Sequence, residues 1–158
     1  MKITLLLLMT FFFYGCAISE EHVLSENAPK DKPVAVYENK VKEFYEAQEP
    51  YIKQARETYP HAKEKYIKGL PKGENFFITT RLIDFTGKVE QVFVLVKSIN
   101  EGVISGDIYS HIHLVKGYSY GQRYSFPESE VYDWLITKPD GREEGNFVGK
   151  FIDAYNKH

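Results

Sequence analysis

Two long apolar stretches separated by a short turn constrain the fold of this 158-residue chain more than any other feature. In residues 74–84 and 88–99, alternate side chains fall on two different faces, as a β-strand requires. Asp84-Phe85-Thr86-Gly87 lies between them as a turn, with glycine where a left-handed backbone is needed. Val92-Phe93-Val94-Leu95-Val96 is apolar on both faces, which is typical of a central strand covered on both sides. The pattern predicts an antiparallel hairpin within a larger sheet.

Two further strands follow after short connections. The turn Asn100-Glu101-Gly102 leads into a strand at residues 103–109, and a fourth strand is expected at residues 123–126. Because all these connections are local, they favour an antiparallel sheet with helices on one face.

The region before the first strand has helical spacing. Its larger side chains recur every three or four residues: Val41, Phe44, Tyr45, Gln48, Tyr51, Ile52, Ala55 and Tyr59. Pro50 and Pro60 interrupt this pattern, and proline costs about 3 kcal/mol inside a helix. We therefore expect two or three consecutive helical pieces with breaks near Glu49 and Tyr59, ending at Gly69-Leu70-Pro71. The aromatic stripe could line a ligand groove, but its spacing is more typical of core packing.

The last third contains a Trp-bearing apolar segment, residues 131–136, then a turn at Pro139-Asp140-Gly141 and a short closing helix with Asn146 as its N-cap. If the segment is extended, Asp133 and Trp134 point to opposite faces. Trp134 is expected to pack into the core against the closing helix at Phe147 and Phe151, although an exposed partner anchor is the alternative. Asp133 is expected to accept backbone N–H bonds near the turn. Together the elements predict a single α+β domain over residues 37–158.

The N-terminus has the pattern of a secretory signal. Residues 3–14 are almost entirely apolar, which is too short to span a bilayer but fits a signal peptide over residues 1–15. Phe13-Tyr14-Gly15-Cys16 resembles the lipobox of bacterial lipoproteins, which implies cleavage before Cys16 and a lipid on its thiol. Ala17 then favours the outer membrane, facing the periplasm; the alternative is a soluble periplasmic or secreted protein. Residues 16–36 are polar and proline-punctuated, which is typical of a flexible tether.

Composition excludes several function classes. The formal net charge is −2 with interspersed signs, whereas nucleic-acid binders carry a basic face. The single cysteine excludes a disulfide framework and a cysteine-based zinc site. No serine-hydrolase elbow, phosphate-binding loop or zinc-protease motif occurs.

The remaining candidates for chemistry are few. His111 and His113 could reach one metal from a strand, with Asp107 on the same alternation, but solvated loop histidines are the better interpretation. Tyr118 and Tyr120, between two glycines, could stack on a sugar or a partner surface, or fold back over the sheet edge. The carboxylates beside turns are expected to be solvated rather than catalytic: Glu128, Glu130, Glu143 and Glu144.

One resemblance covers most of the domain. Residues 90–96, the Gly106 strand, Asp133-Trp134 and the segment 144–147 resemble the bacterial family called domain of unknown function 2314. The likeness runs from about Tyr51 to Tyr155, and it implies the fold and module boundaries without supplying a catalytic residue. Members of that family often carry Asn-x-Pro where this chain has residues 109–111.

These observations predict a binding protein rather than an enzyme. We expect a non-catalytic module anchored in the cell envelope, without cofactor, that binds a protein or an envelope polymer through its sheet face or its tyrosine loop. An immunity-type protein that neutralises a secreted toxin is a narrower version of this hypothesis. The alternative is a small hydrolase with a cleft near Asp133 and the Tyr118/Tyr120 loop.

Overall fold

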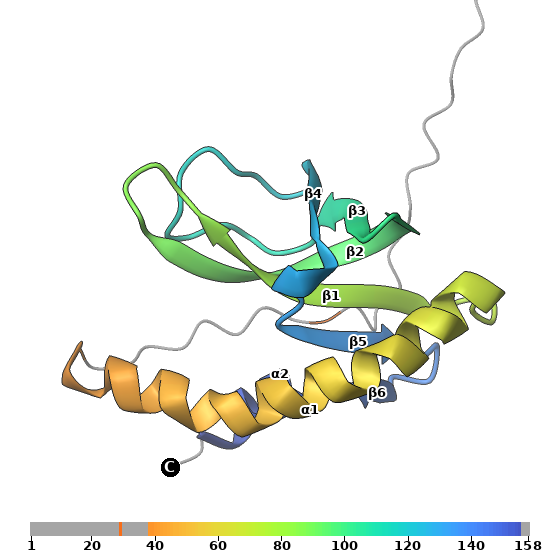
Figure 1. Cartoon of the computed structure of the whole chain (residues 1–158), viewed down its shortest axis with the longest axis horizontal. Helices are drawn as coiled ribbons and strands as arrows, with labels where there is room; N and C mark the ends of the chain where they lie inside the picture. Colours follow the sequence, from red (N-terminus) through yellow and green to blue (C-terminus); the bar gives the residue numbers. More distant parts are fainter. Residues whose placement is uncertain (1–28, 30–37, 156–158) are drawn as a thin grey trace, which may run out of the picture.

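The computed structural model describes residue 29 and residues 38–155, and within them it confirms the α+β fold (Figure 1). The predicted signal peptide, the predicted lipidation site Cys16 and the predicted tether apart from residue 29 lie outside the described residues. In chain order the elements are η1 (Glu38–Lys40), α1 (Val41–Lys68), β1 (Asn75–Ile83), β2 (Val89–Asn100), β3 (Val103–Ile108), β4 (Arg123–Pro127), η2 (Glu128–Glu130), β5 (Asp133–Thr137), β6 (Glu143–Gly145) and α2 (Phe147–Tyr155).

The six strands form one antiparallel sheet in the order β4-β3-β2-β1-β5-β6. The predicted hairpin is confirmed: β1 and β2 pair from Phe77↔Leu95 to Ile83↔Val89, and the turn closes with a Gly87 N–H bond to the Asp84 carbonyl at 2.9 Å. The chain then returns to place β5 on the other side of β1. Both β1 and β2 are therefore interior strands, as their apolar residues require.

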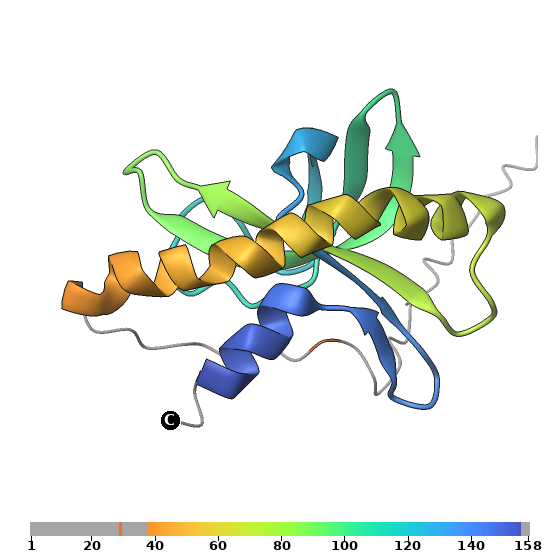
Figure 2. The same cartoon turned by 60° about the horizontal axis from the view of Figure 1, so that its bottom comes forward.

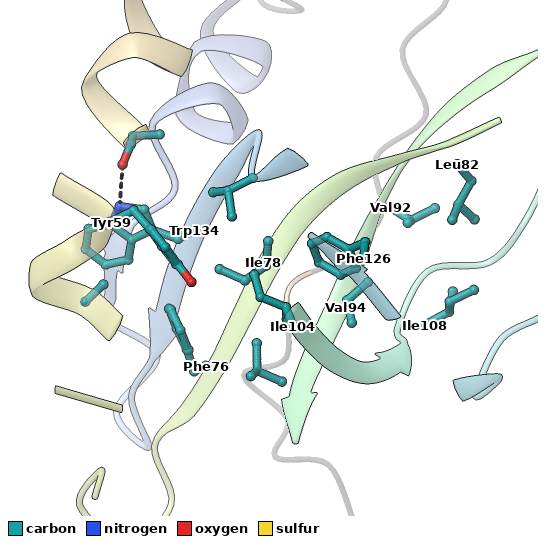
Figure 3. Close-up of a cluster of buried hydrophobic side chains, with 14 of the residues drawn as sticks. Tyr59, Phe76, Ile78, Leu82, Val92, Val94, Ile104, Ile108, Phe126 and Trp134 are labelled. Carbon is teal, nitrogen blue, oxygen red and sulfur yellow. Dashed lines mark hydrogen bonds between the residues drawn. The ribbon is translucent and has the colours of Figure 1, made fainter. Parts of the chain in front are cut away.

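The main core lies between α1 and one face of the sheet (Figure 3). Alternate side chains of the strands, including Ile78, Val94 and Trp134, meet Ala55 and Tyr59 of α1 there. The opposite face carries a smaller cluster of Phe77, Leu95 and Leu135. Figure 2 shows α2 lying beside α1, where its residues Val148 and Ile152 pack with Ile52 and Tyr132. Helix α2 thus adds to the helical layer at the β5 side of the sheet.

The helical region is one unbroken helix of 28 residues, so the prediction of breaks near Glu49 and Tyr59 is wrong. Both Pro50 and Pro60 lie inside α1 on its exposed side, where the carbonyls four residues earlier can be hydrated. The buried side continues without interruption, so tertiary packing offsets the local cost of proline. Despite its length, α1 lacks the apolar run of a bilayer-spanning segment, and no other helix in the described part of the chain has one.

Candidate functional site

Asp133 is buried at the start of β5 and caps helix α2. Its side chain is 1% exposed; one carboxylate oxygen accepts the Trp134 N–H at 2.7 Å and the other accepts the Val148 N–H at 2.7 Å. Val148 belongs to the first turn of α2, where free backbone N–H groups favour a negative charge. The geometry therefore assigns the cap of α2 to a residue from a strand rather than to the residue that precedes the helix.

The predicted location of the Asp133 bonds, at the Pro139-Asp140-Gly141 turn, is wrong. Asp140 itself closes that turn by accepting the Arg142 N–H at 3.0 Å. Strand β6 then runs back along β5, and the Asn146 N–H donates to the Trp134 carbonyl at 2.7 Å, which brings the start of α2 beside Asp133. Gly145 makes this return possible, because its φ is +80° and an added Cβ would lie 2.3 Å from the Trp134 carbonyl oxygen.

Asn146 precedes α2 as predicted, but it has a left-handed backbone with φ of 58° and its side-chain amide donates to Glu143 at 2.7 Å.

Burial raises the pKa of Asp133 to about 6, against the opposing effect of the backbone N–H bonds from Trp134 and Val148. Such a pKa would suit an acid–base group, but both oxygens of Asp133 are already engaged by backbone. The arrangement fits a structural cap.

Trp134 is a core residue, as predicted, and not an exposed anchor. It is 3% exposed, and its indole N–H lies within hydrogen-bond distance of the Ala55 carbonyl at 3.1 Å and the Thr58 hydroxyl at 3.0 Å (Figure 3). Its ring meets Phe147 edge-on at 5.9 Å, which confirms the contact with the closing helix. Phe151, the second expected neighbour, instead packs at a tilt against Tyr51 of α1, with ring centres 4.9 Å apart.

The two tyrosines of the loop between β3 and β4, Tyr118 and Tyr120, differ in their contacts and exposure. The Tyr118 hydroxyl donates to the Ile83 carbonyl at 3.1 Å, and its ring packs edge-on against Tyr124. Tyr120 is 46% exposed and stacks on His111 with ring centres 5.3 Å apart. Tyr118 therefore folds back onto the sheet, and Tyr120 is the more accessible of the two.

The structure does not bring Asp133 and the tyrosine loop together. Asp133 begins β5, whereas the loop joins β3 to β4, and strands β1, β2 and β3 separate β5 from β4 in the sheet. The contacts of Asp133 and of the two tyrosines therefore lend no support to the alternative hypothesis of a hydrolytic cleft that uses both features.

The other titratable candidates are held by structural contacts. Asp107 pairs with Arg123 at 2.9 Å, and the described residues hold no group of three or more histidine, cysteine or acidic side chains placed to bind a metal. Glu128 accepts bonds from Lys63 at 2.7 Å and from the Tyr59 hydroxyl at 2.9 Å. Glu144 pairs with Lys65, which lowers the pKa of that carboxyl. Glu128 of η2 and Glu144 of β6 are therefore partly buried and link their segments to α1 through ion pairs. The prediction that these two carboxylates are solvated is wrong.

A surface that includes Tyr45 and Tyr51, two members of the stripe whose spacing predicted core packing, lies where α1 and α2 meet. We define the aromatic surface as Tyr45, Tyr51, Phe151 and Tyr155, packed around the buried Phe44. The three tyrosines are 42%, 38% and 40% exposed, respectively. The signal was the spacing in α2, where residues 147, 151 and 155 each lie four apart and so form one aromatic stripe.

Comparisons with models of protein families, with curated proteins and with solved structures each gave no match. The resemblance to the domain of unknown function 2314 therefore stays a prediction. A function for this chain has to be inferred from its own geometry.

Proposed function

We propose that this chain is a non-catalytic binding module, held at the cell envelope by a lipid on Cys16, that binds a protein through the aromatic surface. The observation that carries the proposal is the group of three part-exposed tyrosines, Tyr45, Tyr51 and Tyr155, on the joined helices. Tyrosine is enriched in protein interfaces because it offers a large rigid apolar face and a hydroxyl at little cost in conformational entropy.

The rings of the aromatic surface hold one another in place. The ring centres of Phe44 and Tyr155 lie 5.0 Å apart, and those of Tyr51 and Phe151 lie 4.9 Å apart. Each helix therefore holds one tyrosine of the other helix in place. A surface ordered before binding loses less entropy when a partner arrives. Ion pairs such as Lys42–Glu46 and Lys53–Glu57 flank it with both signs of charge, which is typical of the polar rim of a protein interface.

In-cell photo-crosslinking tests the binding surface. A benzophenone amino acid at Tyr51 should give an adduct of discrete mass, whereas the same amino acid at Ile67, a 63% exposed position near the other end of α1, should not. Tyr155→Ala should weaken the adduct, with Ile67→Ala as the matched control. Equal labelling at both positions would argue against this surface, and sedimentation with purified peptidoglycan that depends on Tyr155 would identify an envelope polymer as the ligand instead.

The anchor is tested separately. Cys16→Ser should leave the chain unprocessed or release it from the membrane fraction, and the wild type should incorporate labelled palmitate. A wild-type protein without label, and a variant with unchanged size and distribution, would reject lipidation.

A further inference from the structure

The turn between β1 and β2 lies away from both helices (Figure 1), and it carries a second group of exposed apolar side chains. We define the loop-end tip as Ile83, Phe85 and Leu114, with Lys88 and Lys116 beside them. Phe85 is 85% exposed at the β1–β2 turn, Ile83 is 59% exposed and Leu114 is 48% exposed. Turns of this kind accept most residues at their second position, so the turn does not require an aromatic ring there. Solvent-exposed apolar groups that cluster in this way are typical of a contact site.

Two carboxylates, the buried Asp84 and the partly exposed Glu90, hold the two loops of the tip together. Asp84 accepts the Thr86 N–H at 2.7 Å with one oxygen and the Lys116 N–H at 3.1 Å with the other. Glu90 accepts the backbone N–H groups of residues 113, 114 and 115 at 2.8, 2.8 and 3.0 Å. The turn and the β3–β4 connection therefore present Phe85 and Leu114 from one supported unit.

At the tip, the negative and positive side chains lie in different surroundings. The Asp84 and Glu90 carboxylates face the loop backbone, whereas Lys88 and Lys116 are exposed. Neither lysine belongs to an ion pair with another residue in the described part of the chain. Apolar side chains beside outward-facing ammonium groups match an anionic bilayer, because the chains enter the interface while the ammonium groups meet lipid phosphates.

We propose that the loop-end tip is a membrane contact, in which Phe85 and Leu114 enter the interface of an anionic phospholipid bilayer. The reach of the tip to that bilayer rests on the proposed lipid anchor. If fully extended, a segment as long as residues 16–36 would span at most about 70–75 Å, at roughly 3.3–3.6 Å per residue, which exceeds the diameter of about 35 Å expected for a domain of this size. The tip lies on the sheet side of the molecule, so docking through it leaves the helices and their aromatic surface facing away from the lipid (Figure 1).

Depth-dependent fluorescence quenching tests the membrane contact. The full chain is reconstituted from detergent into vesicles of phosphatidylethanolamine and phosphatidylglycerol, with and without brominated phosphatidylcholine. Phe85→Trp should lose at least twice as much emission to the brominated lipid as Ile67→Trp, which places the probe at an exposed position on α1. The native Trp134 is buried and contributes the same background to both proteins. Reversing the charge of Lys88 and Lys116 to glutamate should reduce the quenching of the Phe85→Trp protein.

Equal quenching of the two probes overturns the membrane contact. The proposal is also overturned if acrylamide in the aqueous phase still quenches the Phe85→Trp probe on the vesicle. That result would indicate that the tip contacts a soluble macromolecule instead of lipid. Both substitutions are at exposed positions, and an unchanged melting temperature verifies that the fold is intact. A failed anchor is recognised separately, because the mass of the chain shows whether Cys16 is acylated. The apolar residues 3–14 of an unprocessed chain still hold it on the vesicle, so the comparison of the two probes remains decisive.

Discussion

The substitution Asp133→Asn tests whether one buried carboxyl sets how the stability of the domain depends on pH. Burial raises the pKa of Asp133 in the folded protein to about 6, from an ordinary value of 3.8, although the Trp134 and Val148 N–H groups oppose this rise. The folded state therefore binds the proton more tightly than the unfolded chain does. The resulting stabilisation is complete below pH 3.8 and is lost as the pH rises through about 6.

The difference between the two pKa values corresponds to about 3 kcal/mol in full, and to about 1.4 kcal/mol between pH 7.5 and pH 5. Five other carboxyls have a lowered pKa and lose their stabilising effect only as the pH falls further: Glu64, Asp84, Glu90, Asp140 and Glu144. Because the other titratable groups are the same in both proteins, the difference between the wild type and Asp133→Asn over pH 7.5 to pH 5 isolates the contribution of Asp133.

Urea unfolding of the wild type and Asp133→Asn, followed by the fluorescence of Trp134, measures this contribution. The free energy of unfolding of the wild type should rise by about 1.4 kcal/mol more than that of the variant when the pH is lowered from 7.5 to 5. Asparagine keeps one acceptor oxygen, so the N–H of Trp134 or Val148 loses its partner, at a cost of about 1–3 kcal/mol at either pH. The same pH dependence in both proteins would refute the assignment of a raised pKa to this carboxyl.

Substitutions at two further positions test the packing of the domain. Trp134→Ala should lower the free energy of unfolding by about 3–5 kcal/mol. Trp134→Phe should lower it by less, about 1–3 kcal/mol, because it keeps a six-membered ring but loses the five-membered ring with its N–H bond. Urea unfolding followed by circular dichroism measures both, and a wild-type midpoint for Trp134→Ala would contradict the burial of this ring. Gly106→Ala should destabilise the β2–β3 pair severely, because the new Cβ would lie 2.3 Å from the Leu95 carbonyl oxygen. Ser105→Ala on the same strand is the control and should change the melting temperature little; equal effects of the two would argue against the close approach at Gly106.

Strands β1 to β4 could be predicted from the sequence because their signals are local. Alternation of side chains and the residues of the turns are contained within a few neighbouring positions, and β1 to β4 begin and end within one or two residues of the expected ranges. The burial of Trp134 followed from the apolar residues around it. Its placement against Phe147 followed from the short closing segment.

The features that could not be predicted depend on contacts between distant segments. Pro50 and Pro60 carry a local cost, but whether a helix bends there depends on the packing of its buried side, which the sequence does not show. The partner of Asp133 depends on the register of β6 against β5, since a shift of that strand would move the start of α2. The aromatic surface likewise needs α1 and α2 to lie side by side before its tyrosines form one group.

The strand order also determines when the sheet can be completed during synthesis. Strand β1 meets β2 after a short turn, but its other neighbour, β5, begins only at Asp133, after β3 and β4 have been made. Until then the backbone of β1 has an unpaired edge carrying Phe76 and Ile78, and open edges of this kind recruit other chains. A chain that stops before β5 would keep its central hairpin and assemble through the edge of β1, instead of forming a smaller stable domain.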